Sequence, residues 1–266
     1  YLRTWGTNKI IIDSNGLNYQ GQDDSYTVEY DTDGETVNIV YSGATNGWIP
    51  LDDDVVAPPP SSLPTQKAIV AFGNSGSITN ISNLVNSSGV VGTDVTGVGT
   101  ARNSLAAAGY GTDKAIFAYG DSGSVTNISN LVSNTGVVSA DVTGVGSSRN
   151  NLAAAGYGGD KAIFAYGDTG SATSISNLVT SSGVVGTDVS GVGTARNGLA
   201  AASYGGDKAI FAYGNSYNIS NLVTSSGVVG TDVTGVGTAR YALAAAGYGT
   251  DKAIFGYGYA GGNVSM

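Results

Sequence analysis

The residues with the clearest capacity for binding recur four times along the chain. They are four tyrosines, each followed three residues later by an aspartate: Tyr110, Tyr157, Tyr204 and Tyr248, with Asp113, Asp160, Asp207 and Asp251. An aromatic face beside a carboxylate can stack on a sugar and accept its hydroxyl hydrogens, and repeated weak sites add avidity. The pattern predicts possible glycan binding. Core packing of the tyrosines, and turn chemistry for the Asp-Lys pairs, is the competing interpretation.

Four arginines recur with the same periodicity: Arg102, Arg149, Arg196 and Arg240. A guanidinium carries five donors and can bind several main-chain carbonyls in a dry interior. We therefore expect these arginines to tie adjacent repeats together as structural residues. The alternative is that they contact a ligand in a central channel.

Catalysis is not expected. The chain has no Cys and no His, which excludes thiol nucleophiles, imidazole bases, disulfides and most zinc sites. Each repeat has the same polar residues, whereas an active site needs one asymmetric set of roles. The acidic clusters at 31–34 and 52–54 lack the spacing of a calcium loop, so we predict solvated turns, with no metal and no cofactor.

Charge and hydropathy limit the partners. Residues 1–66 carry two basic residues, Arg3 and Lys9, against ten acidic ones, while residues 67–266 are nearly neutral. An acidic head on a neutral body argues against nucleic-acid binding, which needs a basic surface. No stretch approaches the roughly 20 apolar residues of a membrane helix, so no membrane span is expected.

A tandem repeat positions these residues. The tripeptide Lys-Ala-Ile recurs at Lys67, Lys114, Lys161, Lys208 and Lys252, with spacings of 47, 47, 47 and 44 residues. The shortened spacing lies between Phe211 and Ile219, which predicts a loop there that tolerates deletion. Each repeat has four short apolar segments separated by Gly, Asp and Ser, as expected for four strands joined by turns.

These repeats predict an all-β fold, a β-propeller of about five four-stranded blades. In the segment 114–120 both faces are apolar, as in a strand covered on both sides, and the Ala-rich segment 105–108 suits a crowded innermost strand. Five Lys-Ala-Ile strands occur with only four Ala-rich ones, so one blade is incomplete. Four blades, with residues 252–258 left over, is the alternative count.

The repeats also resemble a known family. Arg102 and its copies, each followed by a Leu-Ala-Ala-Ala strand and then by an apolar strand ending in Gly120, Gly167, Gly214 or Gly258, are similar to kelch repeats. The segments GVGTAR and LAAAGYGTDKAIF also resemble sequences of tail, neck and appendage fibre proteins of bacteriophages. The resemblance implies a kelch-type propeller in a structural or host-adhesive fibre, located extracellularly or on a virion.

The first 55 residues predict a separate small β module. Strands are expected over residues 8–14, 24–30 and 35–43, with turns at Asn15-Gly16 and Asp33-Gly34. The Pro-rich segment 56–66 predicts a stiff linker, followed by the propeller over 67–266.

The incomplete blade suggests how the chain would assemble. Unpaired strand edges require cover, either from residues 1–66 of the same chain or from a neighbouring subunit. Strand donation between subunits would propagate head to tail. We therefore expect a self-assembling fibre subunit, and the alternative is a lectin-like propeller that binds surface glycans.

Overall fold

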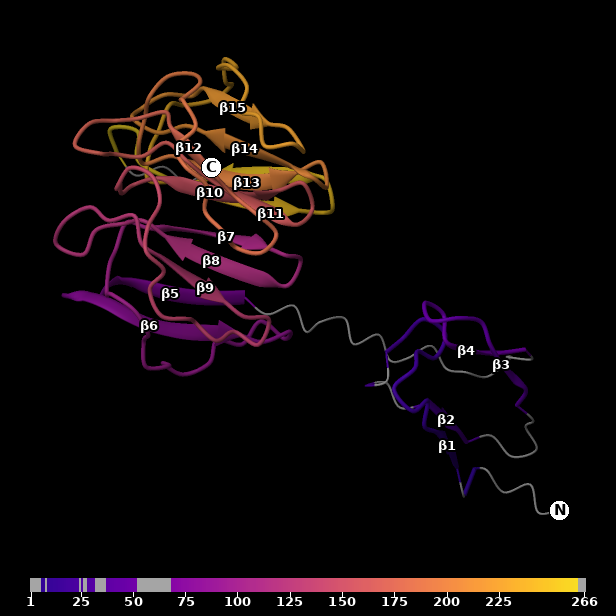
Figure 1. Ribbon diagram of the computed structural model, residues 1–266. Coiled ribbons are helices and arrows are strands. Elements are labelled where there is room, and N and C mark those ends of the chain that lie inside the picture. Colours follow the sequence, from indigo (N-terminus) through magenta and orange to yellow (C-terminus); the bar gives the residue numbers. More distant parts are fainter. Residues whose placement is uncertain are drawn as a thin grey trace. The chain divides into compact units, whose positions relative to one another are not determined.

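The computed structural model describes residues 6–7, 9–23, 25, 28–31, 37–51 and 68–262 (Figure 1). The chain divides into two compact units, Tyr1–Thr65 and Gln66–Met266. The predicted linker 56–66, the acidic cluster 52–54, the turn at Asp33-Gly34 and Lys67 lie outside the described residues.

The described residues of the N-terminal unit form two small antiparallel sheets. One pairs β1 (Ile10–Ile12) with β2 (Val28–Tyr30), and the other pairs β3 (Ile39–Tyr41) with β4 (Trp48–Pro50). The predicted turn is present, because Asn15 and Gly16 have φ values of 55° and 80° and Leu17 N–H donates to the Ser14 carbonyl. A buried contact between the Tyr19 and Tyr30 hydroxyls, 2.6 Å apart, lies in its core.

The repeat part consists of five successive antiparallel sheets, which Figure 1 shows following one another from β5–β6 to β13–β15. Three sheets have three strands each: β7 (Ala106–Tyr110), β8 (Lys114–Ala118) and β9 (Ser129–Val132); β10 (Ala153–Tyr157), β11 (Lys161–Ala165) and β12 (Ser176–Val179); β13 (Ala200–Tyr204), β14 (Lys208–Ala212) and β15 (Ser220–Val223). The first and last sheets have two strands each: β5 (Ala68–Asn74) with β6 (Ile78–Val85), and β16 (Ala244–Tyr248) with β17 (Lys252–Gly256).

The prediction of a strand with two apolar faces is confirmed. In β8, Ile116 and Ala118 on one face and Phe117 on the other are all buried, and so is Tyr119 just beyond the strand. Both faces are therefore covered, which explains why this strand does not alternate apolar and polar residues.

The fourth expected strand of each repeat is not continuous. In the second sheet the segment after β9 pairs with it only through isolated bridges, Ser129 with Val142 and Val132 with Val138. Glycines and polar residues in this segment lower its strand propensity. Each complete repeat therefore has three strands and an outer segment that is bridged at two points.

Successive repeats touch through their Ala-rich strands, since β7 neighbours β10, β10 neighbours β13, and β13 neighbours β16. Main-chain bonds reinforce this order: Asn151 N–H donates to Ser104, Gly198 to Asn151 and Ala242 to Gly198, at 2.8–2.9 Å. The all-β class is confirmed, and no sheet closes on itself within the described residues. Nor do these residues include a helix with the length and apolar character needed to cross a bilayer.

Candidate functional site

The four arginines lie between adjacent sheets. Arg196, which precedes β13, is fully buried, and donates through Nε to Tyr213 O at 2.7 Å, through Nη1 to Thr194 O at 3.1 Å and through Nη2 to Phe211 O at 3.4 Å. Those carbonyls belong to its own repeat. Its guanidinium also lies 4.2 Å from the ring centroid of Tyr166, which belongs to the preceding repeat.

The same contact recurs at every junction between repeats. An arginine lies over the aromatic residue that ends the preceding Lys-Ala-Ile strand, at 4.0–4.2 Å from the ring centroid: Arg102 over Phe72, Arg149 over Tyr119, Arg196 over Tyr166, and Arg240 over Tyr213. A phenylalanine of the following repeat packs on the same ring, as in Tyr119–Phe164 at 5.5 Å. Each arginine therefore joins two adjacent sheets by cation–π contact and hydrogen bonds.

The aromatic residues adopt a special backbone conformation. Tyr119, Tyr166 and Tyr213 have φ values of 63–66°, in the left-handed region that non-glycine residues rarely occupy. The glycine that follows also has positive φ, 106° at Gly167, and a Cβ there would lie 2.7 Å from the Asn150 carbonyl oxygen. This Tyr-Gly turn directs the ring between the sheets. The carbonyls of Tyr119 and Tyr213 also accept from Nε of Arg102 and Arg196, the arginines of their own repeats.

An aspartate completes the sites of Arg102, Arg149 and Arg196. Asp232 accepts hydrogen bonds from Thr194 N at 3.0 Å and Oγ1 at 2.7 Å, and from Asn221 Nδ2 at 3.0 Å. Asn221 in turn accepts from Arg196 Nη2 at 2.6 Å. Asp141 and Asp188 have equivalent partners in the preceding repeats.

The environment of these groups alters their ionisation. Burial lowers the pKa of Arg102 to about 10, which still leaves the guanidinium charged at neutral pH. Burial also raises the pKa of Tyr166 to about 12, so its ring stays neutral beneath Arg196. For Asp232, burial opposes ionisation, but hydrogen bonds from Thr194 and Asn221 outweigh it and keep its pKa below the usual value.

The four candidate glycan-binding tyrosines are not equivalent. Tyr110 and Tyr157 are each 4% exposed, Tyr204 is half-buried, and Tyr248 is 53% exposed. Tyr110 packs against the loop of the next repeat, because a Cβ on Gly183 would lie 2.9 Å from its ring. The rings of Tyr110 and Tyr157 therefore offer no face to a sugar in this structure.

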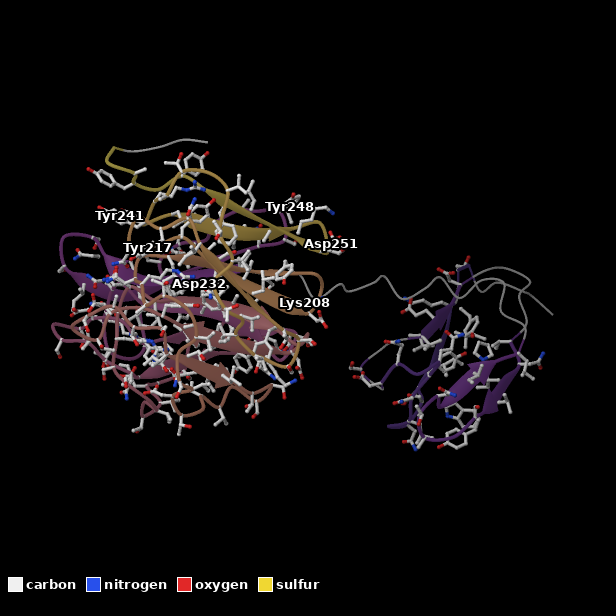
Figure 2. All side chains as sticks on the ribbon, turned by 90° about the horizontal axis from the view of Figure 1, so that it is seen from above. Lys208, Tyr217, Asp232, Tyr241, Tyr248 and Asp251 are labelled. Atoms are coloured by element: carbon white, nitrogen blue, oxygen red, sulfur yellow. The ribbon has the colours of Figure 1, made fainter. Side chains whose placement is uncertain are left out.

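The four candidate aspartates lie in the turns before the last four Lys-Ala-Ile strands. Their side chains approach the adjacent lysine, at 2.7 Å for Asp160 and Asp251 and 3.9 Å for Asp113 and Asp207. Main-chain carbonyls of three of these aspartates accept a bond from the preceding repeat, as in Gly158 N–H to Asp207 O at 2.7 Å. Figure 2 shows Tyr248, Asp251 and Lys208 on one side of the repeat part and Tyr217 and Tyr241 on the opposite side.

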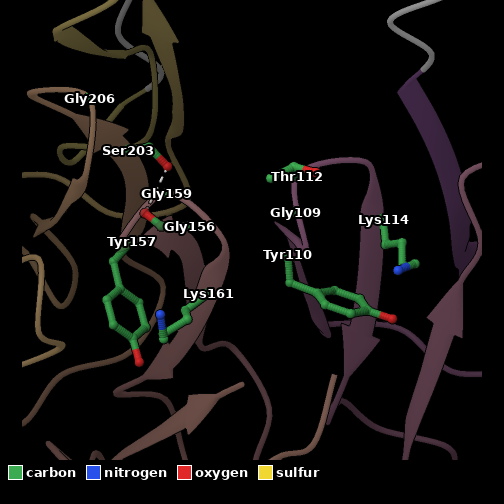
Figure 3. A pocket seen from close by; sticks show the side chains of 10 residues that line it. All are labelled: Gly109, Tyr110, Thr112, Lys114, Gly156, Tyr157, Gly159, Lys161, Ser203 and Gly206. Carbon is green, nitrogen blue, oxygen red and sulfur yellow. Dashed lines mark hydrogen bonds between the residues drawn. The ribbon is translucent and has the colours of Figure 1, made fainter. Parts of the chain in front are cut away.

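A shallow hollow of about 230 Å³ crosses these turns. It brings together Tyr110, Lys114, Tyr157 and Lys161, and Ser203 closes it by donating to Gly156 O at 2.9 Å (Figure 3). Lysine ammoniums and glycine main chain line it, so it offers polar contacts without an aromatic platform. The described residues include no cluster of acidic side chains suited to a metal ion.

Sequence reasoning identified the arginines but not their partners. Each arginine follows an aspartate by eight residues, at Asp94, Asp141, Asp188 and Asp232, and this constant spacing is the signal in the sequence that could have found these aspartates. The aromatic residues under the arginines were assigned only to a strand face. Neither a scan against protein-family models nor a search of curated proteins finds a match to this chain.

Proposed function

We propose that the chain is a structural or adhesive subunit of an extracellular or virion-associated fibre, built around a kelch-type β-propeller of about five blades. One observation carries this proposal: near-identical units are joined by one repeated set of contacts, the arginine over the aromatic ring. Uniform junctions make a stiff body, and the polar residues repeat without the asymmetry that an enzyme site needs.

The ends of the repeat part support self-assembly. Ile254 and Tyr257 of the last repeat are 57% and 64% exposed, although their counterparts Ile163 and Tyr166 are fully buried under the next repeat. At the other end, Val70 of β5 is 60% exposed. Exposed apolar faces of this kind mark contact with another unit, either within a closed ring or between copies.

Electron microscopy tests this proposal. Negative-stain images of the purified chain are expected to show ordered filaments of ring-shaped beads, and sedimentation is expected to show association that grows with concentration. Monodisperse particles at all concentrations, with no ring, contradict both the propeller and the fibre.

The second candidate function is weak, multivalent glycan binding. The hollow at the turns, together with the exposed ring of Tyr248, favours it. A glycan array with the intact chain is the test, with Tyr248→Ala expected to reduce binding and Tyr217→Ala, at an exposed tyrosine on the opposite side of the repeat part, expected to leave it unchanged. Equal signals from the intact chain and from Tyr248→Ala would reject a role for this tyrosine.

A further inference from the structure

The last repeat presents a surface that we call the open edge, made of the free side of β17, Arg240, Thr238, Tyr204 and Leu222. The strands β8, β11 and β14 are each hydrogen-bonded on both sides, whereas β17 pairs only with β16 among the described residues. Exposed strand edges are templates for pairing with another segment. The complete repeats show what kind of segment fits there.

In a complete repeat, a Ser-Asn-Leu-Val strand covers this edge and supplies polar partners. Phe211 of β14 pairs with Asn221, whose side chain accepts from Arg196 and donates to Asp232. Asp232 then accepts from the main chain and hydroxyl of Thr194. Thr238 and Arg240 occupy the corresponding positions at the open edge, where no aspartate or asparagine of the described residues reaches them.

The turn after that strand covers the preceding repeat. A Cβ on Gly227 would lie 2.9–3.1 Å from Tyr157 and Leu178, so this turn packs directly on both side chains. Tyr157 is buried as a result. The corresponding residues at the open edge are Tyr204, which is half-buried, and Leu222, which is 42% exposed.

The first repeat carries the complementary half of this interface. Its β6 continues into a turn at Gly89 and then to Asp94, and Asn83 Nδ2 donates to Asp94 Oδ1 at 2.9 Å. Asp94 is exposed, no arginine or threonine of the described residues contacts it, and nothing lies within 4 Å of a Cβ on Gly89. Of the groups that the open edge lacks, Asp94 and Gly89 are therefore exposed on this segment and Asn83 is partly exposed.

We infer that the open edge binds residues 78–94 of a second copy of the chain. In this arrangement Asn83 faces Arg240, Asp94 accepts from Thr238, and Gly89 covers Tyr204 and Leu222. The strand β17 replaces β5 beside β6, with Phe255 opposite Asn83, as Phe211 is opposite Asn221. The inference rests on the proposed self-assembly and names the surfaces that perform it.

The exchange is energetically balanced at the main chain. One antiparallel strand pair is opened and an equivalent one is formed, because β5 and β17 share the Ala-Ile segment that sets the register. The side chains favour the exchange, because Asp94 gains the hydroxyl of Thr238 as a donor and Asn83 gains the guanidinium of Arg240. The repeat part has almost no net charge, so the repeat parts of two copies do not repel each other strongly.

A peptide with the sequence of residues 78–95 tests the receptor side. We expect it to bind the full chain in isothermal titration calorimetry and to dissociate its oligomers in sedimentation experiments. Replacing Asp94 by Asn in the peptide, or Thr238 by Val in the chain, is expected to weaken binding roughly tenfold, as for one charge-assisted hydrogen bond. The matched control Thr250→Val, at another exposed threonine, is expected to bind as the unmodified chain does.

Full-length variants test the second-copy occupant. Asp94→Asn and Thr238→Val are each expected to weaken self-association about tenfold, and the double variant no further, because the two groups form one contact. Unchanged association in both single variants, or no peptide binding, overturns the inference. Filaments that persist in the double variant would leave the fibre proposal standing on another contact, whereas peptide binding without filaments would reject the fibre alone.

Discussion

At the scale of single residues, the buried arginines are the most consequential side chains of the repeat part. A buried guanidinium is stable only while its donors are satisfied, and Arg196 meets this condition with four hydrogen bonds and an aromatic face. The described partners of Arg149 and Arg240 do not include one for Nε. The arginines are thus repeated in sequence but not identical in contacts.

We predict that Arg196→Met lowers the free energy of unfolding by about 3 kcal/mol, because it leaves buried carbonyls and Asn221 without a donor. Arg240→Met, at the last repeat with fewer partners, is the matched control and is expected to cost roughly half as much. Urea unfolding followed by circular dichroism measures both. Equal losses would show that the extra contacts of Arg196 carry no stability.

The glycine after each aromatic residue provides a second test at this scale. Gly167→Ala is expected to destabilise the chain by at least about 2 kcal/mol, since the new methyl group meets the Asn150 carbonyl in a left-handed conformation. Gly170 has nearly the same φ, 108°, but nothing within 4 Å of its Cβ, so Gly170→Ala is expected to cost only about 1 kcal/mol. Comparing melting temperatures separates crowding from backbone strain, and equal shifts would contradict the proposed crowding.

At the scale of elements, the strand hairpin is the constant part of each repeat and the loop after it is variable. The fourth sheet lacks three residues in this loop, yet closes it with Tyr217 N–H donating to Gly214 O at 2.8 Å. The third sheet uses the equivalent bond, Thr173 N–H to Gly167 O at 2.9 Å. The loop length is therefore not coupled to the register of the strands.

We predict that deleting residues 170–172 costs less than about 1 kcal/mol, because loop closure depends only weakly on length and the closing bond can re-form. Deleting residues 158–160 is the control and is expected to be severely destabilising, because it removes the turn and the bond from Gly158 to Asp207. Thermal unfolding of the two variants checks this. Similar losses would mean that the loop after β11 also fixes the sheet.

At the scale of the whole molecule, each repeat contacts its neighbours, so stability is approximately a sum of similar junctions. A group that occurs once per repeat therefore contributes to the stability of the chain several times. Asp141, Asp188 and Asp232 all have pKa values held below the usual 3.8, where hydrogen bonds from threonine, serine and asparagine outweigh burial.

These aspartates predict a loss of stability in acid. A folded-state pKa below the unfolded value stabilises the protein above pH 3.8, and this stabilisation disappears as the pH falls below 3.8 towards the folded-state pKa. Urea midpoints are expected to be flat near neutral pH and to fall steeply below about pH 4. Thr194→Val is expected to flatten this fall, because Asp232 loses one donor. An unchanged pH profile in that variant would contradict the assigned cause.

The sequence by itself determined much of this protein's local structure. Repetition of Lys-Ala-Ile located every strand of that type within the described residues, which do not include Lys67. Apolar residues on both faces of 115–118 predicted burial on both sides. The turn at Asn15-Gly16 followed from residue type alone, because few residues tolerate positive φ. The all-β class followed from the same local signals.

Only the tertiary structure decided which residues face one another. That Tyr119 lies under Arg149, that Tyr157 is covered while Tyr248 is exposed, and that Asp141 binds Thr100 are contacts between segments far apart in the sequence. The prediction of a continuous fourth strand was wrong for a related reason. Whether a Gly-rich segment forms a continuous ladder depends on its neighbours more than on its own propensity. Local periodicity fixes strands and turns, whereas burial and partner choice are set by packing between repeats.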